Sequence, residues 1–183
     1  QPEARLGAAS PNVPFFVDTG SLPAHNFHLA GIEAAWVDGP LSLQSEWIIA
    51  AVDSRDAGML AFGGWYATAT WFLTGEYRPY NRQLGTFDRV IPRRDFIRYR
   101  GQPADKCVEL GPGAWQIALR LSQIDLNDGP VRGGRLTDLS VGLNWYLNPY
   151  LRMTSIYIHA FSIYSVFLKS GTDIYAMRVG IDF

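Results

Sequence analysis

Apolar residues recur at every second position along most of this chain, and this pattern constrains the fold more than any other feature. In the last segment the apolar set is Tyr175, Met177, Val179, Ile181 and Phe183. The residues between them are mostly small or polar. Side chains two apart share one face of a β-strand, whereas a helix needs apolar residues three and four apart. The pattern predicts strands with one apolar and one polar face.

The same alternation occurs in seven segments, and helical periodicity is hard to find. The segments are 27–37, 41–51, 60–73, 114–122, 136–147, 150–161 and 174–183. Most are long enough to cross a bilayer as tilted strands, which takes about 9–11 residues. No apolar run approaches the ~18 residues of a transmembrane helix. We therefore expect an all-β fold, with an antiparallel sheet that forms part of a transmembrane β-barrel.

The connections between these segments differ in length. Gly39-Pro40 and Asn148-Pro149 are minimal turns. Three other connections are expected to be longer polar loops, namely 52–59, 123–135 and 162–172. Short turns at one rim and longer loops at the other are typical of outer-membrane barrels. The chain, residues 1–183, then divides into a connecting loop (1–25), three strands (26–73), a long connection (74–113) and four strands (114–183).

Composition excludes several classes of protein. Lys and Arg number 16 against 17 Asp and Glu, a formal charge of −1, so the chain lacks the basic excess of a nucleic-acid binder. Hydrophobic residues make up 48% of the chain but the mean hydropathy is only −0.03, as expected for apolar residues spread by alternation. The single cysteine, Cys107, excludes an internal disulfide and a cysteine-based zinc site. His25, His28 and His159 lack metal-ligand spacing, so we expect no metal and no cofactor.

A soluble β-sandwich also alternates, so the placement of tryptophan is used to separate the two architectures. We expect the six Trp residues to lie mostly near strand ends on the apolar face: Trp36, Trp47, Trp65, Trp71, Trp115 and Trp145. Amphipathic rings at strand ends form the aromatic girdles of a membrane barrel. A sandwich more often buries its Trp in the middle of strands. The placement favours a barrel.

Several segments resemble the phosphate-selective porin O and P family of bacterial outer-membrane channels. They include Gly31-Ile32-Glu33-Ala34-Ala35-Trp36, Phe72-Leu73-Thr74-Gly75-Glu76, Gly113-Ala114-Trp115-Gln116, Asp125-Leu126-Asn127-Asp128-Gly129 and Leu143-Asn144-Trp145-Tyr146-Leu147-Asn148-Pro149. The resemblance implies an outer-membrane location in contact with lipid and a sixteen-stranded, homotrimeric barrel, of which this chain is similar to the C-terminal half. Residues 1–12 lack the features of a signal peptide, which fits a removed leader or a C-terminal fragment. The Phe183 ending looks like the signal read by the barrel assembly machinery.

A channel of this kind needs a wet lumen with a chosen electric field and no acid, base or nucleophile, so we do not expect an enzyme. Arg or Lys on the lumen wall suits anions. The candidate pore-lining cations on the polar faces are Arg120, Arg152 and Arg178. We expect passive diffusion of phosphate-like anions or small polar solutes. The alternative for each Arg is an ion pair with a lumen acid, and the acids are Glu33, Glu46, Asp138 and Asp182.

The segment 76–100 carries seven Arg against three acids, a local balance of +4. Counted back from a periplasmic C-terminus, it lies on the periplasmic side, where Arg93 and Arg94 are candidates for attracting anions at the inner mouth. The alternative is a solvated connection. For the whole chain, the alternative from another class is a non-channel small barrel or sandwich that binds a ligand or serves as an anchor.

Overall fold

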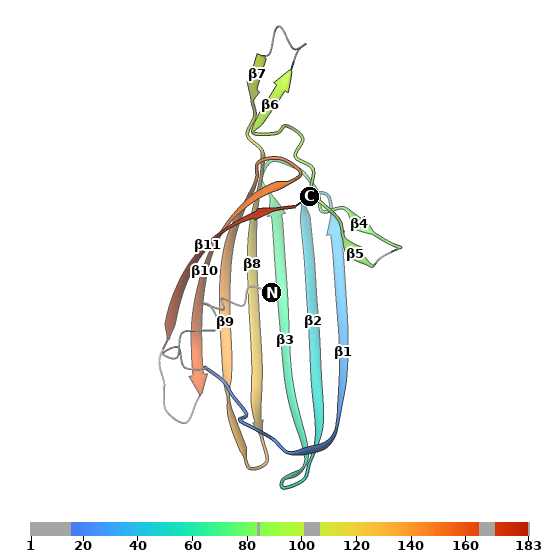
Figure 1. Ribbon diagram of the computed structural model, residues 1–183, viewed down its shortest axis with the longest axis vertical. Helices are drawn as coiled ribbons and strands as arrows, with labels where there is room; N and C mark the ends of the chain where they lie inside the picture. The colour runs from blue at the N-terminus through green and yellow to red at the C-terminus, as the bar shows by residue number, and fades with distance from the viewer. Residues whose placement is uncertain (1–15, 84, 101–106, 165–170, 183) are drawn as a thin grey trace.

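The computed structural model describes residues 16–83, 85–100, 107–164 and 171–182. Within these residues one antiparallel sheet has the strand order β1-β2-β3-β8-β9-β10-β11 (Figure 1). Its strands are β1 (Ala24–Asp38), β2 (Leu41–Ser54), β3 (Gly58–Phe72), β8 (Ala114–Asp128), β9 (Val131–Tyr146), β10 (Leu151–Tyr164) and β11 (Thr172–Ile181). The all-β antiparallel prediction is confirmed. The sheet is open in this chain, with β1 and β11 as its two edges.

Two small hairpins interrupt the order between β3 and β8. The first joins β4 (Tyr80–Asn81) to β5 (Thr86–Phe87), and the second joins β6 (Ile97–Arg100) to β7 (Cys107–Leu110). Both lie at the end of the sheet where β3 stops, which is also the end of the β1–β2 turn, the β9–β10 turn and the last residues of β11 (Figure 1). We call this end the insertion rim. The opposite end carries the β2–β3 and β8–β9 turns.

At the opposite end, two connections are shorter than the sequence suggested. Only Arg55, Asp56 and Ala57 separate β2 from β3, and only Gly129 and Pro130 separate β8 from β9. The prediction of long polar loops at 52–59 and 123–135 is therefore wrong. Backbone pairing continues past the apolar stripe, where charged residues such as Asp53 and Asp125 take apolar-face positions. Of the third predicted loop, 162–172, β10 takes the first residues and β11 begins at Thr172, while 165–170 lie outside the described residues.

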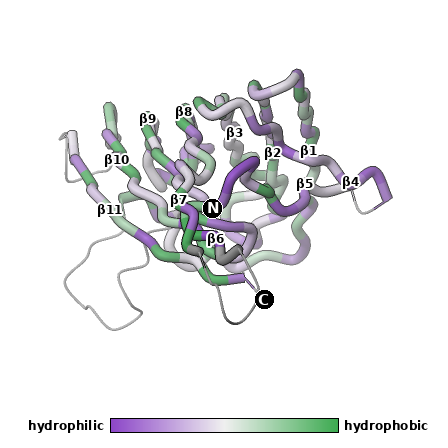
Figure 2. The backbone as a smooth tube through the Cα atoms, turned by 90° about the horizontal axis from the view of Figure 1, so that it is seen from above, coloured by the Kyte–Doolittle hydropathy of each residue, from purple (hydrophilic) through white to green (hydrophobic). Residues whose placement is uncertain are grey.

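The register puts polar and apolar side chains on opposite faces of the sheet. One row across the strands is Ser42, Thr70, Ala118 and Gly142, and the next row along the strands is Leu41, Trp71, Ile117 and Leu143. We call the faces to which these rows belong the polar face and the apolar face. Figure 2 shows that hydrophilic and hydrophobic residues interleave along the strands and that the sheet is curved.

Burial is the reverse of that in a water-soluble domain. On the polar face Ser42, Thr70, Ser140 and Gln116 are buried, Gln116 with only 3% of its surface exposed. The apolar face is open, with Trp71 54% exposed and several others similarly uncovered: Leu43, Trp47, Leu119, Val141, Leu143, Tyr175, Met177 and Val179. No second sheet covers this face within the described residues. Such an apolar surface calls for lipid or another protein surface.

The tryptophans follow the girdle prediction only in part. Four of the six lie within the last or first few residues of their strands, all toward the insertion rim: Trp36, Trp71, Trp115 and Trp145. Trp47 and Trp65 instead face one another in the middle of β2 and β3, so for these two the strand-end prediction is wrong.

A small core anchors the insertion to the sheet. Phe72, Val90 and Ala114 are buried together, and the Tyr146 ring packs on that of Phe72 with centroids 5.9 Å apart. Val90 comes from the insertion and the others from the ends of β3, β8 and β9. The described part of the chain contains no helix long and apolar enough to cross a membrane.

Candidate pore-wall site

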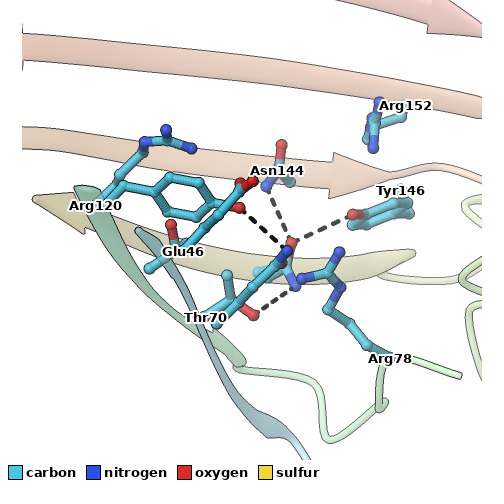
Figure 3. Close-up of a pocket in the computed structure, with 11 residues that line it drawn as sticks. Glu46, Thr70, Arg78, Arg120, Asn144, Tyr146 and Arg152 are labelled. Carbon is cyan, nitrogen blue, oxygen red and sulfur yellow. Dashed lines mark hydrogen bonds between the residues drawn. The ribbon is translucent and has the colours of Figure 1, made fainter. Parts of the chain in front are cut away.

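A cleft of about 440 Å³ lies on the polar face. Five neighbouring strands contribute to it, from β2 through β3, β8 and β9 to β10, and Arg78 of the insertion closes its side nearest the insertion rim (Figure 3). Its lining is dominated by amides, hydroxyls and charged groups. A second cleft of about 370 Å³ adjoins it, and the two share Arg78, Tyr146 and Arg152.

Arg120 enters the cleft from the middle of β8. The register places it between Thr68 of β3 and Ser140 of β9. Its guanidinium carbon lies 3.8 Å from the centroid of the Tyr66 ring, a cation–π geometry. This contact holds the cation against the wall and leaves its N–H groups available for an anion.

Arg152 lies at the start of β10, opposite Tyr146 of β9, and its guanidinium carbon is 5.6 Å from that ring centroid. It lines both clefts. Arg178 lies on the same polar face, opposite Thr154, but lines neither cleft. The structure thus brings Arg120 and Arg152 to one cleft and places Arg178 beside it on the outermost strand.

Arg78 is a cleft residue that alternation did not identify as pore-lining. It lies in the insertion, and its guanidinium carbon is 3.7 Å from the centroid of the Phe87 ring. Burial lowers the pKa of Arg78, with smaller effects from Tyr146, which raises it, and Arg152, which lowers it. An arginine remains charged nonetheless. A connection without periodicity gives no sign of which face it will cover, so only the excess of Arg in 76–100 pointed to this region.

Neutral side chains between the cations are tied into a network centred on Gln116. Its Oε1 accepts hydrogen bonds from Asn144 Nδ2 at 3.0 Å and from the Tyr146 hydroxyl at 3.2 Å, and its Nε2 donates to Thr70 Oγ1 at 3.2 Å (Figure 3). Thr154 Oγ1 in turn donates to Asn144 Oδ1 at 2.8 Å. These bonds fix the wall without using the charged groups.

Of the lumen acids, Asp138 is engaged by hydroxyl groups and Asp182 lines the second cleft together with Arg152. Asp138 accepts from Ser122 Oγ at 2.6 Å and from Ser140 Oγ at 3.3 Å. The ion pairs among the described side chains join Arg135 to Asp125 and His159 to Asp173, all of them on apolar-face positions of the strands. Neither pair involves a candidate pore-lining arginine. In the part of the chain that the structure describes, no group of His, Cys, Asp and Glu has the arrangement to hold a metal.

The two mouth candidates lie in the insertion at the insertion rim, outside both clefts. The backbone N–H of Arg93 donates to Glu76 Oε1 at 3.1 Å, and the guanidinium of Arg93 lies against Gly75. The Arg94 side chain packs close to Gly111, where an added Cβ would lie 3.1 Å from Arg94 Cβ. Arg93 therefore has a structural contact in addition to its charge.

An antiparallel sheet with an exposed apolar face, a polar face built of fixed dipoles and cations, and membrane-length strands defines a wall of a transmembrane β-barrel. Comparison with known sequences gives the family. The pattern of the family described as "Phosphate-selective porin O and P" matches residues 12–183. The chain belongs to this family, and it is a β-barrel protein of the bacterial outer membrane.

Two curated relatives give the extent of the match. Porin O of Pseudomonas aeruginosa is 28% identical over 141 residues, which is 71% of this chain and 29% of that protein. An uncharacterised protein of Caulobacter vibrioides is 30% identical over 136 residues, which is 74% of this chain and 25% of that protein. The chain thus matches less than a third of the length of either relative.

Proposed function

We propose that this chain forms the C-terminal half of the wall of an outer-membrane channel through which phosphate-like anions and small polar solutes diffuse passively. The observation that carries the proposal is the grouping of Arg78, Arg120 and Arg152 around adjoining clefts on the polar face. Each guanidinium lies over an aromatic ring, and among the described residues none of the three forms an ion pair with a carboxylate. A planar guanidinium donates to two oxygens of a phosphate at once, which suits it to this class of solute.

The open sheet and the family support a proposal for the assembly. The free edges of β1 and β11 leave backbone donors and acceptors without strand partners in this sheet, and in lipid such groups must be satisfied by closure. We propose a sixteen-stranded barrel that assembles as a homotrimer. Recognition by the barrel assembly machinery through the Phe183 end belongs to the same proposal; Phe183 itself lies outside the described residues.

The test is the ion preference of the full-length channel in a planar lipid bilayer. A KCl gradient across the wild-type channel should give a reversal potential of the sign for anion preference. The double variant Arg120→Gln, Arg152→Gln should shift that potential toward zero. Arg135→Gln is the matched control, because Arg135 is paired with Asp125 at an apolar-face position. Equal reversal potentials in the double variant and the wild type would sink the proposal.

A further inference from the structure

Charge on the polar face is divided between the two sides of the sheet. The acids Glu33 and Glu46 lie on β1 and β2, while the cations Arg120, Arg152 and Arg178 lie on β8, β10 and β11. Two acids on the basic flank are exceptions, Asp138 of β9 and Asp182 just after β11: two serine hydroxyls already donate to Asp138, and Asp182 lines the second cleft, not the larger one. A solute in this part of the lumen therefore has negative charge on one flank and positive charge on the other.

On the acidic flank, Glu33 and Glu46 are direct cross-strand partners. Both carboxylates project from the same face of the sheet, since paired residues of adjacent strands point the same way. Like charges directly opposite each other in a sheet are destabilising. A positive group that reaches this pair reduces the repulsion between the two carboxylates. Glu46 lines the larger cleft, where a solute can reach it.

Tyr66 separates the acidic flank from the basic one. It is the cross-strand partner of Glu46, and its hydroxyl faces that carboxylate while also accepting from Gln44 Nε2 at 3.3 Å. Its ring lies under the Arg120 guanidinium at 3.8 Å. Glu46 and Arg120 stand two strands apart, or about 10 Å between backbones. The ring thus keeps them as two separate charges. Both Glu46 and Arg120 line the same cleft (Figure 3).

We infer that Glu46 and Arg120 form a two-charge recognition site for small zwitterionic solutes. The ammonium group of such a solute binds at Glu46, with Glu33 behind it, and its carboxylate or phosphonate accepts hydrogen bonds from Arg120. The inference rests on the proposed channel and names a solute class that its wall selects. A simple anion needs only the arginines, so Glu46 is the residue that distinguishes a zwitterion site from an anion site.

Liposome swelling with the full-length protein tests this inference, using 4-aminobutyrate as the zwitterion and erythritol as an uncharged solute. Both have zero net charge, so neither needs a counterion to enter. The measured quantity is the ratio of the two swelling rates. Glu46→Gln and Arg120→Gln should each lower this ratio by about threefold or more, because each removes one charge-assisted hydrogen bond. Asp53→Asn and Arg135→Gln, which change charges at apolar-face positions, should keep the wild-type ratio.

A second arm uses inorganic phosphate. In bilayer recordings, Arg120→Gln should raise the phosphate concentration that halves the chloride current, whereas Glu46→Gln should not raise it. An unchanged swelling ratio in Glu46→Gln would overturn the inference, as would a Glu46→Gln variant in which phosphate affinity falls. If the wild-type protein admits neither solute and carries no current, the proposed channel itself is wrong.

Discussion

Trp115 and Trp145 are cross-strand partners whose rings stack with centroids 4.9 Å apart and an angle of 15° between planes. Both indole N–H groups donate to the same acceptor, the Pro112 carbonyl oxygen, at 3.0 and 2.9 Å. Phe96 of the insertion packs edge-on against Trp145 at 4.8 Å. The pair therefore connects two strands to the insertion at the insertion rim, where the interface between lipid and water is expected.

Replacing Trp145 by Phe removes one donor to Pro112 and shrinks the stacked surface. We expect the free energy of unfolding in lipid vesicles, measured by denaturant titration, to fall by about 1 kcal/mol. Trp36→Phe is the control, because Trp36 lies at the same rim but outside this stacked pair. Equal losses in the two variants would mean that the stacked pair has no special role.

Gly113 lies directly before β8 with φ of +67°, and an added Cβ would lie 2.5 Å from the Tyr146 carbonyl oxygen. Gly113→Ala should therefore destabilise the protein by more than ~1 kcal/mol and slow its folding into vesicles. Gly142→Ala is the matched control: its Cβ would meet Ala118 Cβ at 3.6 Å, an ordinary contact. A Gly113→Ala variant as stable as Gly142→Ala would contradict this account of the turn.

Glu76 is only 4% exposed and joins three parts of the rim. Its carboxylate accepts hydrogen bonds from the Thr74 hydroxyl and from the backbone N–H of Arg93. Thr74 Oγ1 in turn accepts a hydrogen bond from the backbone N–H of Trp115 at 3.0 Å. Glu76→Ala leaves buried donors unpaired and should cost about 1–3 kcal/mol of unfolding free energy. Glu76→Gln keeps an acceptor and should lose less. Similar losses for the two variants would show that side-chain size, and not hydrogen bonding, matters at this position.

Neutralising the mouth candidates tests the role of the insertion's charge. Arg93→Gln together with Arg94→Gln should lower the anion preference of the reconstituted channel, measured as the reversal potential in a KCl gradient, because two positive charges leave the mouth. The control is Arg55→Gln, in the turn at the opposite end of the sheet. An unchanged reversal potential in the double variant would support the alternative of a solvated connection.

Alternation located the main strands because each has one face against an apolar medium. It failed where that medium ends: Asp53 and Asp125 still pair as strand at apolar-face positions, while apolar residues such as Leu60 and Ile124 take the other face. The strands therefore continue by backbone hydrogen bonding beyond the alternation of apolar and polar residues from which they were predicted. Alternation also placed Arg120, Arg152 and Arg178 on the polar face correctly, since facing follows from period two.

Alternation does not predict which side chains from distant parts of the sequence contact one another. Arg78 reaches the cleft because the insertion folds over the ends of β9 and β10, and nothing in its own segment specifies that. The same applies to Tyr66, which alternation placed on the polar face but not beneath Arg120. The Gln116 network likewise depends on register across three strands, which is set by pairing and not by any local motif.

The central claim is that one face of this sheet meets lipid and the other meets water. Cysteine scanning from 116 to 122 tests it most directly, in full-length protein whose Cys107 has been replaced by Ser and which is reconstituted in vesicles. A water-soluble maleimide should label cysteines at Gln116, Ala118, Arg120 and Ser122 and leave those at Ile117, Leu119 and Leu121 unlabelled. Labelling without a two-residue period, or equal labelling of both sets, would contradict the claim.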